Sequence, residues 1–279
     1  MAITENTSRE FVFTEKDFNR LRQISNAHTG IVVTDDKYDM YYSRLVKRIR
    51  KLELSSFADY VMYLEKNQDT EFTPFIDSIT TNLTSFFREN HHFEMLRNHV
   101  LPELATRSNE IRVWSAGCST GEEPYSIAIT LKDFSQSHPA IRPHLLASDI
   151  DTTVLGKAAT GVYEISRVNG LAQSMLKRWF KRGKGSNEGM VKVSKELQQF
   201  MEFRQVNLMQ DWPIREKFHI IFCRNVVIYF DRPTKIRLLD RYANQLVDNG
   251  YLILGHSESL NGLTDRFETI GKTVYQKKN

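Results

Sequence analysis

The sequence predicts an α/β fold, with a helical domain first, a parallel sheet after it and a small antiparallel β-subdomain inserted into the second domain. Apolar residues recur at three- and four-residue spacing over residues 14–98, which is typical of amphipathic helices. From Ile111 onward, apolar strand-like runs alternate with helical segments, as in a doubly wound sheet. This alternation is interrupted over residues 166–207. We therefore expect a helical domain with its linker at 1–88 and an α/β domain at 89–279.

In the helical domain, the spacing of Phe18, Leu21 and Ile24 predicts one amphipathic helix, and residues 42–49 continue the same periodicity in a second. Ser55 and Ser56 are suited to cap a third helix, because their hydroxyls can accept from free amides at a helix start. Either Thr84 or Ser85 is predicted to cap a helix that runs through His91 to Leu96.

In the second domain, Ile111 to Trp114 is predicted to be a strand, Ser115 to Pro124 a tight turn and Tyr125 to Leu131 a helix. Leu145 to Ser148 is a second strand candidate, which completes a βαβ unit.

Further along, Phe218 to Cys223 and Gly250 to Gly255 are apolar runs of the kind that parallel strands buried on both faces require. A helix is expected between them, from Pro233 to Val247.

The inserted segment has a different pattern of predicted elements. It is predicted to contain a short helix at Leu171 to Phe180, a basic flexible loop at 181–187 and antiparallel strands at Met190 to Ser194 and Gln199 to Val206.

Composition limits the function classes. The chain has 279 residues, 41% of them hydrophobic and 26% charged, which is ordinary for a globular protein. Its formal charge of +4 is smaller than a nucleic-acid-binding domain usually carries, so we expect no nucleic-acid partner. Cys118 and Cys223 lie in apolar strand-like contexts, which favours a reducing compartment over a disulfide framework.

The hydropathy pattern predicts neither a signal peptide nor a membrane-spanning helix. Residues 1–13 lack the apolar run of a signal peptide, and no later run reaches membrane-spanning length. A cytoplasmic protein without direct membrane insertion is expected.

The turn Gly117-Cys118-Ser119-Thr120-Gly121 connects a predicted strand to a predicted helix, an arrangement that brings the main chain close to a nucleotide-like ligand. Glu122 and Glu123 follow it, and carboxylates there repel a pyrophosphate but suit hydroxyls, an amino group or a sulfonium. This favours a ligand other than a dinucleotide. Taken alone, the segment would equally fit an ordinary βα turn with acidic residues at the helix start.

Asp149 ends the second predicted strand, where an acidic residue can bind ribose hydroxyls. The alternative is that Asp149 or Asp151 caps the following helix.

The same glycine turn also matches G-x-S-x-G, the nucleophile turn of α/β-hydrolases. A serine hydrolase using Ser119, Asp231 and His256 is therefore the main alternative. That turn normally follows several strands, however, whereas everything before Ile111 is predicted to be helical.

Basic residues cluster in the second predicted helix, where Arg44, Lys47, Arg48 and Lys51 share one face. Such a face would attract an acidic helix, although a merely solvated face is the plainer interpretation.

No metal site is predicted. The adjacent His91 and His92 would diverge by about 100° on a helix, and they are expected at the surface or at a helix cap.

Five segments, in this order along nearly the whole chain, together resemble the CheR family of chemotaxis receptor methyltransferases. They are residues 81–88 (TNLTSFFR), 113–126 (VWSAGCSTGEEPYS), 147–151 (ASDID), 222–230 (FCRNVVIYF) and 250–259 (GYLILGHSES). Five segments in one order are far more specific than the glycine turn alone.

The resemblance implies a Rossmann-like domain that binds S-adenosylmethionine and releases S-adenosylhomocysteine, with an inserted β-subdomain, behind an all-α domain. It implies a set of cofactor contacts: Asn82, Thr84, Arg88, Gly117, Glu122, Asp149, Asn207, Arg224 and Asn225. It also implies that Arg88, Arg224 and Tyr229 are catalytic.

The implied reaction is the formation of methyl esters on glutamate side chains of chemotaxis receptors. A glutamate with a reference pKa of about 4.3 is already a carboxylate at neutral pH, so the enzyme must mainly position the reactants. The face of Arg44, Lys47, Arg48 and Lys51 becomes a candidate receptor dock. In some relatives the β-subdomain binds a tethering peptide at the receptor C-terminus, and here residues 183–194 would be the place to look.

The chain is expected to act as a monomer. An alternative of another class is a receptor-binding module that has kept the fold without catalysing the reaction.

Overall fold

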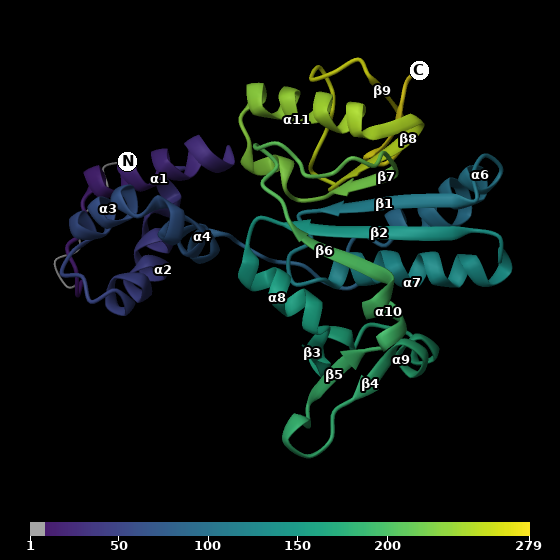
Figure 1. Cartoon of the computed structure of the whole chain (residues 1–279), viewed down its shortest axis with the longest axis horizontal. Coiled ribbons are helices and arrows are strands. Elements are labelled where there is room, and N and C mark those ends of the chain that lie inside the picture. Colours follow the sequence, from purple (N-terminus) through teal and green to yellow (C-terminus); the bar gives the residue numbers. More distant parts are fainter. Residues whose placement is uncertain (1–8) are drawn as a thin grey trace.

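The computed structural model describes residues 9–279, and residues 1–8, part of the stretch assessed for a signal peptide, lie outside the described residues. The first four helices pack together at one end of the molecule (Figure 1). They are α1 (Glu15–Thr29), α2 (Tyr38–Lys51), α3 (Phe57–Lys66) and α4 (Gln68–Ile79).

Local signals explain where these helices start. The Thr14 hydroxyl accepts from the Asp17 amide in a capping box, and Ser56 caps α3 as predicted. The apolar face of each helix then packs into one core, in which Phe18, Leu45 and other side chains are fully buried.

A linker over residues 80–90 leads to the second part of the chain. The next helix begins at His91, so the predicted cap at Thr84 or Ser85 is wrong. It runs as α5 (His91–Met95), a π-helical turn (Leu96–Val100) and α6 (Leu101–Ala105).

A seven-stranded sheet forms the centre of the second part, in the order β6-β2-β1-β7-β8-β10-β9. The strands are β1 (Glu110–Ala116), β2 (Arg142–Asp149), β6 (Met201–Gln205), β7 (Phe218–Cys223), β8 (Leu246–Leu254), β9 (Phe267–Gly271) and β10 (Val274–Lys277). The first five strands in this order are parallel, and β10 pairs in antiparallel with β8 on one side and with β9 on the other.

Helices cover both faces of this sheet (Figure 1). On one face, α7 (Glu122–Ser137) packs with Ile111 and Val113 of β1; on the other, α11 (Arg232–Gln245) packs with Trp114. This alternation along β1 is what a strand buried on both faces requires. The predicted helix at 233–247 ends slightly earlier, because β8 already begins at Leu246.

The chain leaves β1 toward β2 on one side and reaches β7 on the other, so the strand order reverses between β1 and β7. Ligands of doubly wound sheets bind outside the carboxyl ends of strands at such a point. The predicted glycine turn follows β1 and therefore lies there.

The inserted antiparallel sheet differs from the prediction in its limits, because it begins at Val162, before residue 166, and does not include residues 201–205. It has the order β3-β5-β4 and projects below the main sheet in Figure 1. Its elements are β3 (Val162–Glu164), a 3-10 turn (Ile165–Val168), α9 (Gln173–Trp179), β4 (Phe180–Arg182), a 3-10 turn (Gly185–Asn187) and β5 (Met190–Val193).

The predicted antiparallel strand at Gln199–Val206 is wrong. After α10 (Lys195–Phe200), residues 201–205 form β6, which pairs in parallel with β2 at the edge of the main sheet. Alternation alone does not distinguish a strand at the edge of a parallel sheet from one in an antiparallel hairpin.

The predicted fold class is confirmed: an all-α unit, then a mostly parallel α/β sheet with an antiparallel insertion. The domain limits at residues 88 and 89 stay a prediction. In the described part of the chain, none of the helices has the length and apolarity needed to cross a membrane.

Candidate active site

A cavity opens at the carboxyl ends of β1, β2 and β7, between the sheet and the helical bundle. Nine of the ten residues predicted for cofactor binding or catalysis line it: Asn82, Thr84, Arg88, Gly117, Asp149, Asn207, Arg224, Asn225 and Tyr229. They come from the linker and from the loops that follow four strands. The tenth, Glu122, is not among the lining residues.

The glycine turn forms the floor of the cavity. Gly117 has φ +90°, and a Cβ atom on it would lie only 2.5 Å from Cγ2 of Val226. The amides of Gly117 and Cys118 both donate to the Ser148 carbonyl at 2.8 Å, which ties the turn to the end of β2. Glycine is required here because the loop after β7 packs directly on the turn.

Asp149 and Asp151 have separate roles. Asp151 caps α8 (Thr152–Thr160) by accepting from two amides of its first turn. Asp149 instead lines the cavity, and its carboxylate accepts from the amides of Ser119 (2.8 Å) and Asp151 (3.0 Å). The cap interpretation therefore applies to Asp151 and not to Asp149.

The Asp149 carboxylate suits a pair of ribose hydroxyls. Each of its oxygens already accepts one amide, and a carboxylate offers about four lone-pair positions, so capacity for two further donors is left. Burial raises the pKa of Asp149 to about 6, although the amide hydrogen bonds oppose this shift. The group is thus ionised at neutral pH but close to protonation.

Of the two adjacent glutamates, Glu123 lines the cavity, whereas Glu122, which was predicted to contact the cofactor, does not. Glu122 is fully buried and does not line the cavity, with Arg167 Nη2 at 2.8 Å and the Thr120 hydroxyl at 2.6 Å. Glu123 lines the cavity and accepts from the Ser115 hydroxyl at 2.8 Å. Adjacent residues at a helix start point about 100° apart, and the sequence pattern does not show which one faces the ligand.

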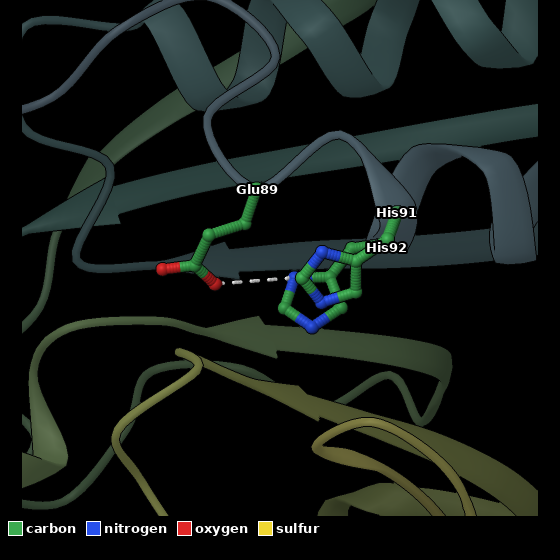
Figure 2. Close-up of side chains that lie close together, drawn as sticks. All are labelled: Glu89, His91 and His92. Atoms are coloured by element: carbon green, nitrogen blue, oxygen red, sulfur yellow. Dashed lines mark ion pairs between the residues drawn. The ribbon is translucent and has the colours of Figure 1, made fainter.

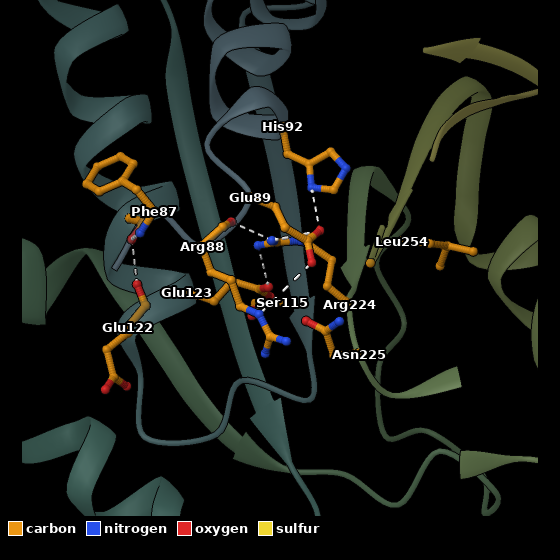
Figure 3. Close-up of polar contacts among 12 residues, drawn as sticks. Phe87, Arg88, Glu89, His92, Ser115, Glu122, Glu123, Arg224, Asn225 and Leu254 are labelled. Atoms are coloured by element: carbon orange, nitrogen blue, oxygen red, sulfur yellow. Dashed lines mark hydrogen bonds and ion pairs between the residues drawn. The ribbon is translucent and has the colours of Figure 1, made fainter. Parts of the chain in front are cut away.

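Arg88 is presented to the cavity by an unusual stretch of linker (Figure 3). Its neighbours Phe87 and Glu89 have φ of +51° and +56°, in the left-handed region that non-glycine residues rarely adopt. The Phe87 amide donates to the Ser126 hydroxyl at 2.9 Å, and the Arg88 guanidinium donates to the Leu83 carbonyl at 2.8 Å.

Arg224 is enclosed rather than free. Its side chain is only 2% exposed, with Nη1 3.2 Å from Glu123 and Nη2 3.2 Å from Glu89. It also donates to the main-chain carbonyl of Arg88. Figure 3 shows this guanidinium between the two carboxylates. Arg224 therefore supports the main chain at Arg88, and its charge is neutralised by Glu89 and Glu123.

Glu89 connects this network to the loop after β8. Its carboxylate accepts from the His256 amide at 3.0 Å and lies 2.8 Å from Nδ1 of His256. Burial opposes ionisation, but His256 and the charge of Arg224 outweigh it and lower the pKa of Glu89 to about 2. Sequence reasoning missed Glu89, although it directly follows the resemblance segment that ends at Arg88.

The helical bundle closes the other side of the cavity. The amide of Val32 donates to the Tyr229 carbonyl at 2.8 Å, and Ile31 pairs with Phe230 as an isolated antiparallel bridge. Asn207 contacts the same part of the bundle, because its Nδ2 donates to the His28 carbonyl at 2.8 Å. The sequence offered no signal for this contact, because the paired segments lie about 200 residues apart.

Asn82 and Thr84 line the cavity from the linker. Asn82 donates to Asp151 at 2.8 Å and thereby anchors the linker on the start of α8. The Thr84 carbonyl accepts from Arg167 at 3.3 Å.

The predicted basic face of α2 is only partly free. Arg44 donates to the Ile79 carbonyl at the end of α4, and Arg48 makes a two-pronged contact with the buried carboxylate of Glu71. The other two members, Lys47 and Lys51, are exposed. A receptor dock on α2 would therefore depend on the lysines, because both arginines serve the packing of the bundle.

The hydrolase triad is not assembled. The Ser119 hydroxyl donates to the Asn82 carbonyl, Asp231 caps α11 through the Thr234 amide, and His256 contacts Glu89. Each proposed triad member has a different partner, so this alternative is wrong.

Within residues 9–279, one group has the composition of a metal site: Glu89, His91 and His92, whose potential ligand atoms lie within 4.8 Å of one another (Figure 2). His92 is fully buried, which corrects its predicted surface position, and the two rings lie 4.1 Å apart. Burial, aided by Arg224, lowers the pKa of His92 to about 4, so the ring is neutral. A metal bound to Glu89 would lie beside the Arg224 guanidinium and displace its ion pair.

Comparisons with known proteins identify the family of the chain. Residues 82–276 match the family model described as CheR methyltransferase, SAM binding domain, and residues 16–80 match CheR methyltransferase, all-alpha domain. The chain is 45% identical over 270 residues to proteins named chemotaxis protein methyltransferase from Salmonella typhimurium and Escherichia coli. These matches cover 96% of this chain and 92% and 93% of those proteins. Chemotaxis protein methyltransferase 2 of Pseudomonas aeruginosa is 44% identical over 96% of this chain and 95% of that protein.

The family models therefore account for both the helical bundle and the sheet that carries the cavity. This chain belongs to the CheR family of S-adenosylmethionine-dependent methyltransferases.

Proposed function

We propose that this methyltransferase esterifies glutamate side chains in the cytoplasmic region of chemotaxis receptors. The observation that carries the proposal is the cavity itself, which holds a buried acid, Asp149, together with a guanidinium, Arg88. The acid suits the hydroxyls of the cofactor, and the guanidinium suits a substrate carboxylate. The name of the relatives, chemotaxis protein methyltransferase, supports a chemotaxis protein as the substrate.

The chemistry fits a site without a strong base. Bound S-adenosylmethionine supplies a methyl group on a sulfonium; the glutamate carboxylate forms the new O–CH3 bond while the S–CH3 bond breaks and its electron pair stays on sulfur. No proton is transferred, because the carboxylate is already ionised at neutral pH. The contribution of the protein is to hold the reactants in line, for which effective molarities of about 10⁵ to 10⁸ M are attainable.

We assign the roles of the site residues on the same basis. Asp149 holds the ribose hydroxyls, and Gly117 allows close approach of the cofactor. Arg88 binds the substrate carboxylate, with its guanidinium turned toward the cavity by the linker. Tyr229 orients that carboxylate or packs on the cofactor; it is 36% exposed and lines the same cavity. Arg224, predicted to be catalytic, is reassigned to holding Arg88 in place.

The decisive experiment uses tritium-labelled S-adenosylmethionine and a cytoplasmic fragment of a receptor. Ester formation is measured as the radioactive methanol that base releases from the methyl ester. Arg88→Ala and Tyr229→Ala should each lower this amount by about 100-fold or more. Arg215→Ala, at an exposed position, serves as the matched control. Near-normal ester formation by both site variants would contradict these roles. Cofactor binding by the wild type without any turnover would instead favour a silent receptor-binding module.

We further propose that the inserted sheet tethers the enzyme to receptors. The predicted strand at 190–194 cannot accept a peptide, because β5 is the central strand and both its edges are paired. The free edge of β4 carries the exposed Lys181 and Arg182, which suits a peptide ending in a carboxylate. Titration of a synthetic receptor C-terminal peptide tests this: Lys181→Glu combined with Arg182→Glu should weaken binding, and unchanged binding would rule out this edge.

A cytoplasmic location and a monomeric state complete the proposal. The first follows from the receptor region that carries the substrate glutamates, and size-exclusion chromatography with light scattering would test the second.

A further inference from the structure

Glu258, in the loop after β8, is a buried carboxylate that accepts hydrogen bonds from four main-chain amides. One oxygen, Oε2, accepts from Asn225 at 2.9 Å and from Gly255 at 2.6 Å. The other, Oε1, accepts from Val226 at 3.0 Å and from Ile228 at 3.1 Å. The residue is only 4% exposed.

The charge of Glu258 is balanced by main-chain dipoles. Within residues 9–279, no basic side chain lies within ion-pair distance of this carboxylate. Hydrogen bonds to an ionised acceptor are roughly twice as strong as neutral ones, and convergent amides can hold an anion without a cation. The four bonds therefore hold the loop firmly around one buried group.

Three of the four amides belong to the loop after β7, which carries Asn225 and Tyr229 into the cavity. Asn225 has φ +59°, a conformation that needs support from its surroundings in a non-glycine residue. Val226 packs against Gly117, so the same loop also defines the floor of the cofactor site.

Gly255 shows how closely the two loops fit. A Cβ atom there would lie 2.9 Å from the Asn225 amide nitrogen and 2.9 Å from Oε2 of Glu258. The loop after β8 thus approaches the loop after β7 as closely as a glycine allows, with Glu258 between them.

We propose that Glu258 is a positioning residue for methyl transfer. It does not line the cavity, and it acts by fixing the main chain that places Tyr229 against the reactants. This inference rests on the proposed function of the site, in which Tyr229 takes part in the transfer.

Glu258→Gln tests the role with a near-isosteric change. Glutamine keeps one accepting oxygen and replaces the other with an NH2 donor that would face two amide donors. We expect kcat to fall by about 30- to 100-fold, because small misplacements of reacting groups cost that much. The rate is expressed per S-adenosylhomocysteine binding site measured by calorimetric titration, so loss of folded protein does not lower it.

Three comparisons separate positioning from a merely structural role. Glu268→Gln, an exposed acid in β9, should leave kcat unchanged. Glu258→Asp keeps the charge and should retain more activity than Glu258→Gln. In a Tyr229→Phe background, Glu258→Gln should lower kcat by much less than in the wild type, because both changes act on one element.

A full, additive loss in that background would overturn the inference, as would a normal kcat per binding site in Glu258→Gln. If the wild type itself forms no receptor ester, the proposed function fails instead, which is a distinguishable result.

A further measurement needs no variant. In wild-type protein the amides of Asn225, Val226 and Ile228 should exchange slowly with deuterium, since each donates to Glu258. Fast exchange at these three amides would contradict the proposed support.

Discussion

In the helical bundle, Arg48 pairs with one carboxylate, Glu71, and its side chain is 15% exposed. At the edge of the cavity, Arg224 lies between two carboxylates, Glu89 and Glu123, and is 2% exposed. Both arginines were predicted to meet the substrate or the cofactor, and both are engaged within the fold. Counting basic residues on one face of a helix or in a motif therefore overestimates how many charges a partner can reach.

The two pairs also differ in what they hold. Arg48 joins α2 to α4 within the bundle, whereas Arg224 supports the main chain of Arg88 next to the cavity. The same side chain thus contributes only to stability in one region and to the geometry of the site in the other. The following changes test this difference, from the largest expected effect to the smallest.

Arg224→Met should destabilise the protein most. It leaves two carboxylates without their cation in a buried site, a loss of about 3–5 kcal/mol in the free energy of unfolding. Urea denaturation measures the loss, and ester formation should fall as well because Arg88 loses its support. Arg215→Met, at an exposed arginine, should stay within about 0.5 kcal/mol of the wild type. Equal stability of the two variants would refute the buried network.

Arg48→Met should cost less, about 1–3 kcal/mol, because Glu71 keeps the hydrogen bond from the Tyr60 hydroxyl at 3.0 Å. The rate per folded molecule should remain that of the wild type. Adding Glu71→Gln should restore part of the stability, since it removes the uncompensated charge. Strongly reduced receptor methylation by folded Arg48→Met would instead show that Arg48 takes part in receptor docking.

Cofactor affinity should depend on pH through Asp149. Its pKa is raised to about 6 by burial, so the carboxylate is ionised above this pH and protonated below it. If the ionised form binds the ribose hydroxyls, the dissociation constant of S-adenosylhomocysteine should be about tenfold higher at pH 5 than at pH 8. Titration calorimetry across this range measures the profile, and Asp149→Asn should bind weakly with little pH dependence. A flat wild-type profile would argue against an ionised Asp149 as the ligand.

Lys47→Glu and Lys51→Glu should have the smallest effects. Each reverses one exposed charge, so receptor KM should rise by about threefold at low salt, and the difference should shrink as salt is added. Thermal stability should not change. Lys16→Glu, on an exposed position of α1, is the control. A receptor KM that is the same for both α2 variants and the wild type at low salt would remove α2 from the docking surface.

Local signals in the sequence predicted much of the architecture. The hydroxyl of Ser56, the apolar run at Phe218 to Cys223 and the glycine turn at Gly117 each acted through a few neighbouring residues, and each prediction is confirmed. The strand at 201–205 was found but placed in the wrong sheet, because its partner β2 lies more than 50 residues away.

In the candidate site, too, local signals were predictable and long-range contacts were not. Nine of the residues that line the cavity could be identified from motif position, because the carboxyl ends of parallel strands meet at one edge of the sheet. Their individual roles could not, since the neighbours Glu122 and Glu123 have different partners and Arg224 is neutralised by residues about 100 and 135 positions away.

The sequence by itself determined most helices and strands, the family and nine of the residues around the cavity, since these depend on periodicity, capping and motif order. Only the tertiary structure decided which charges are free, that the bundle closes over the site through Val32, and that Glu258 accepts hydrogen bonds from four main-chain amides. The physical reason is that burial and pairing set the availability of a charge, and both arise from contacts between segments far apart in the chain.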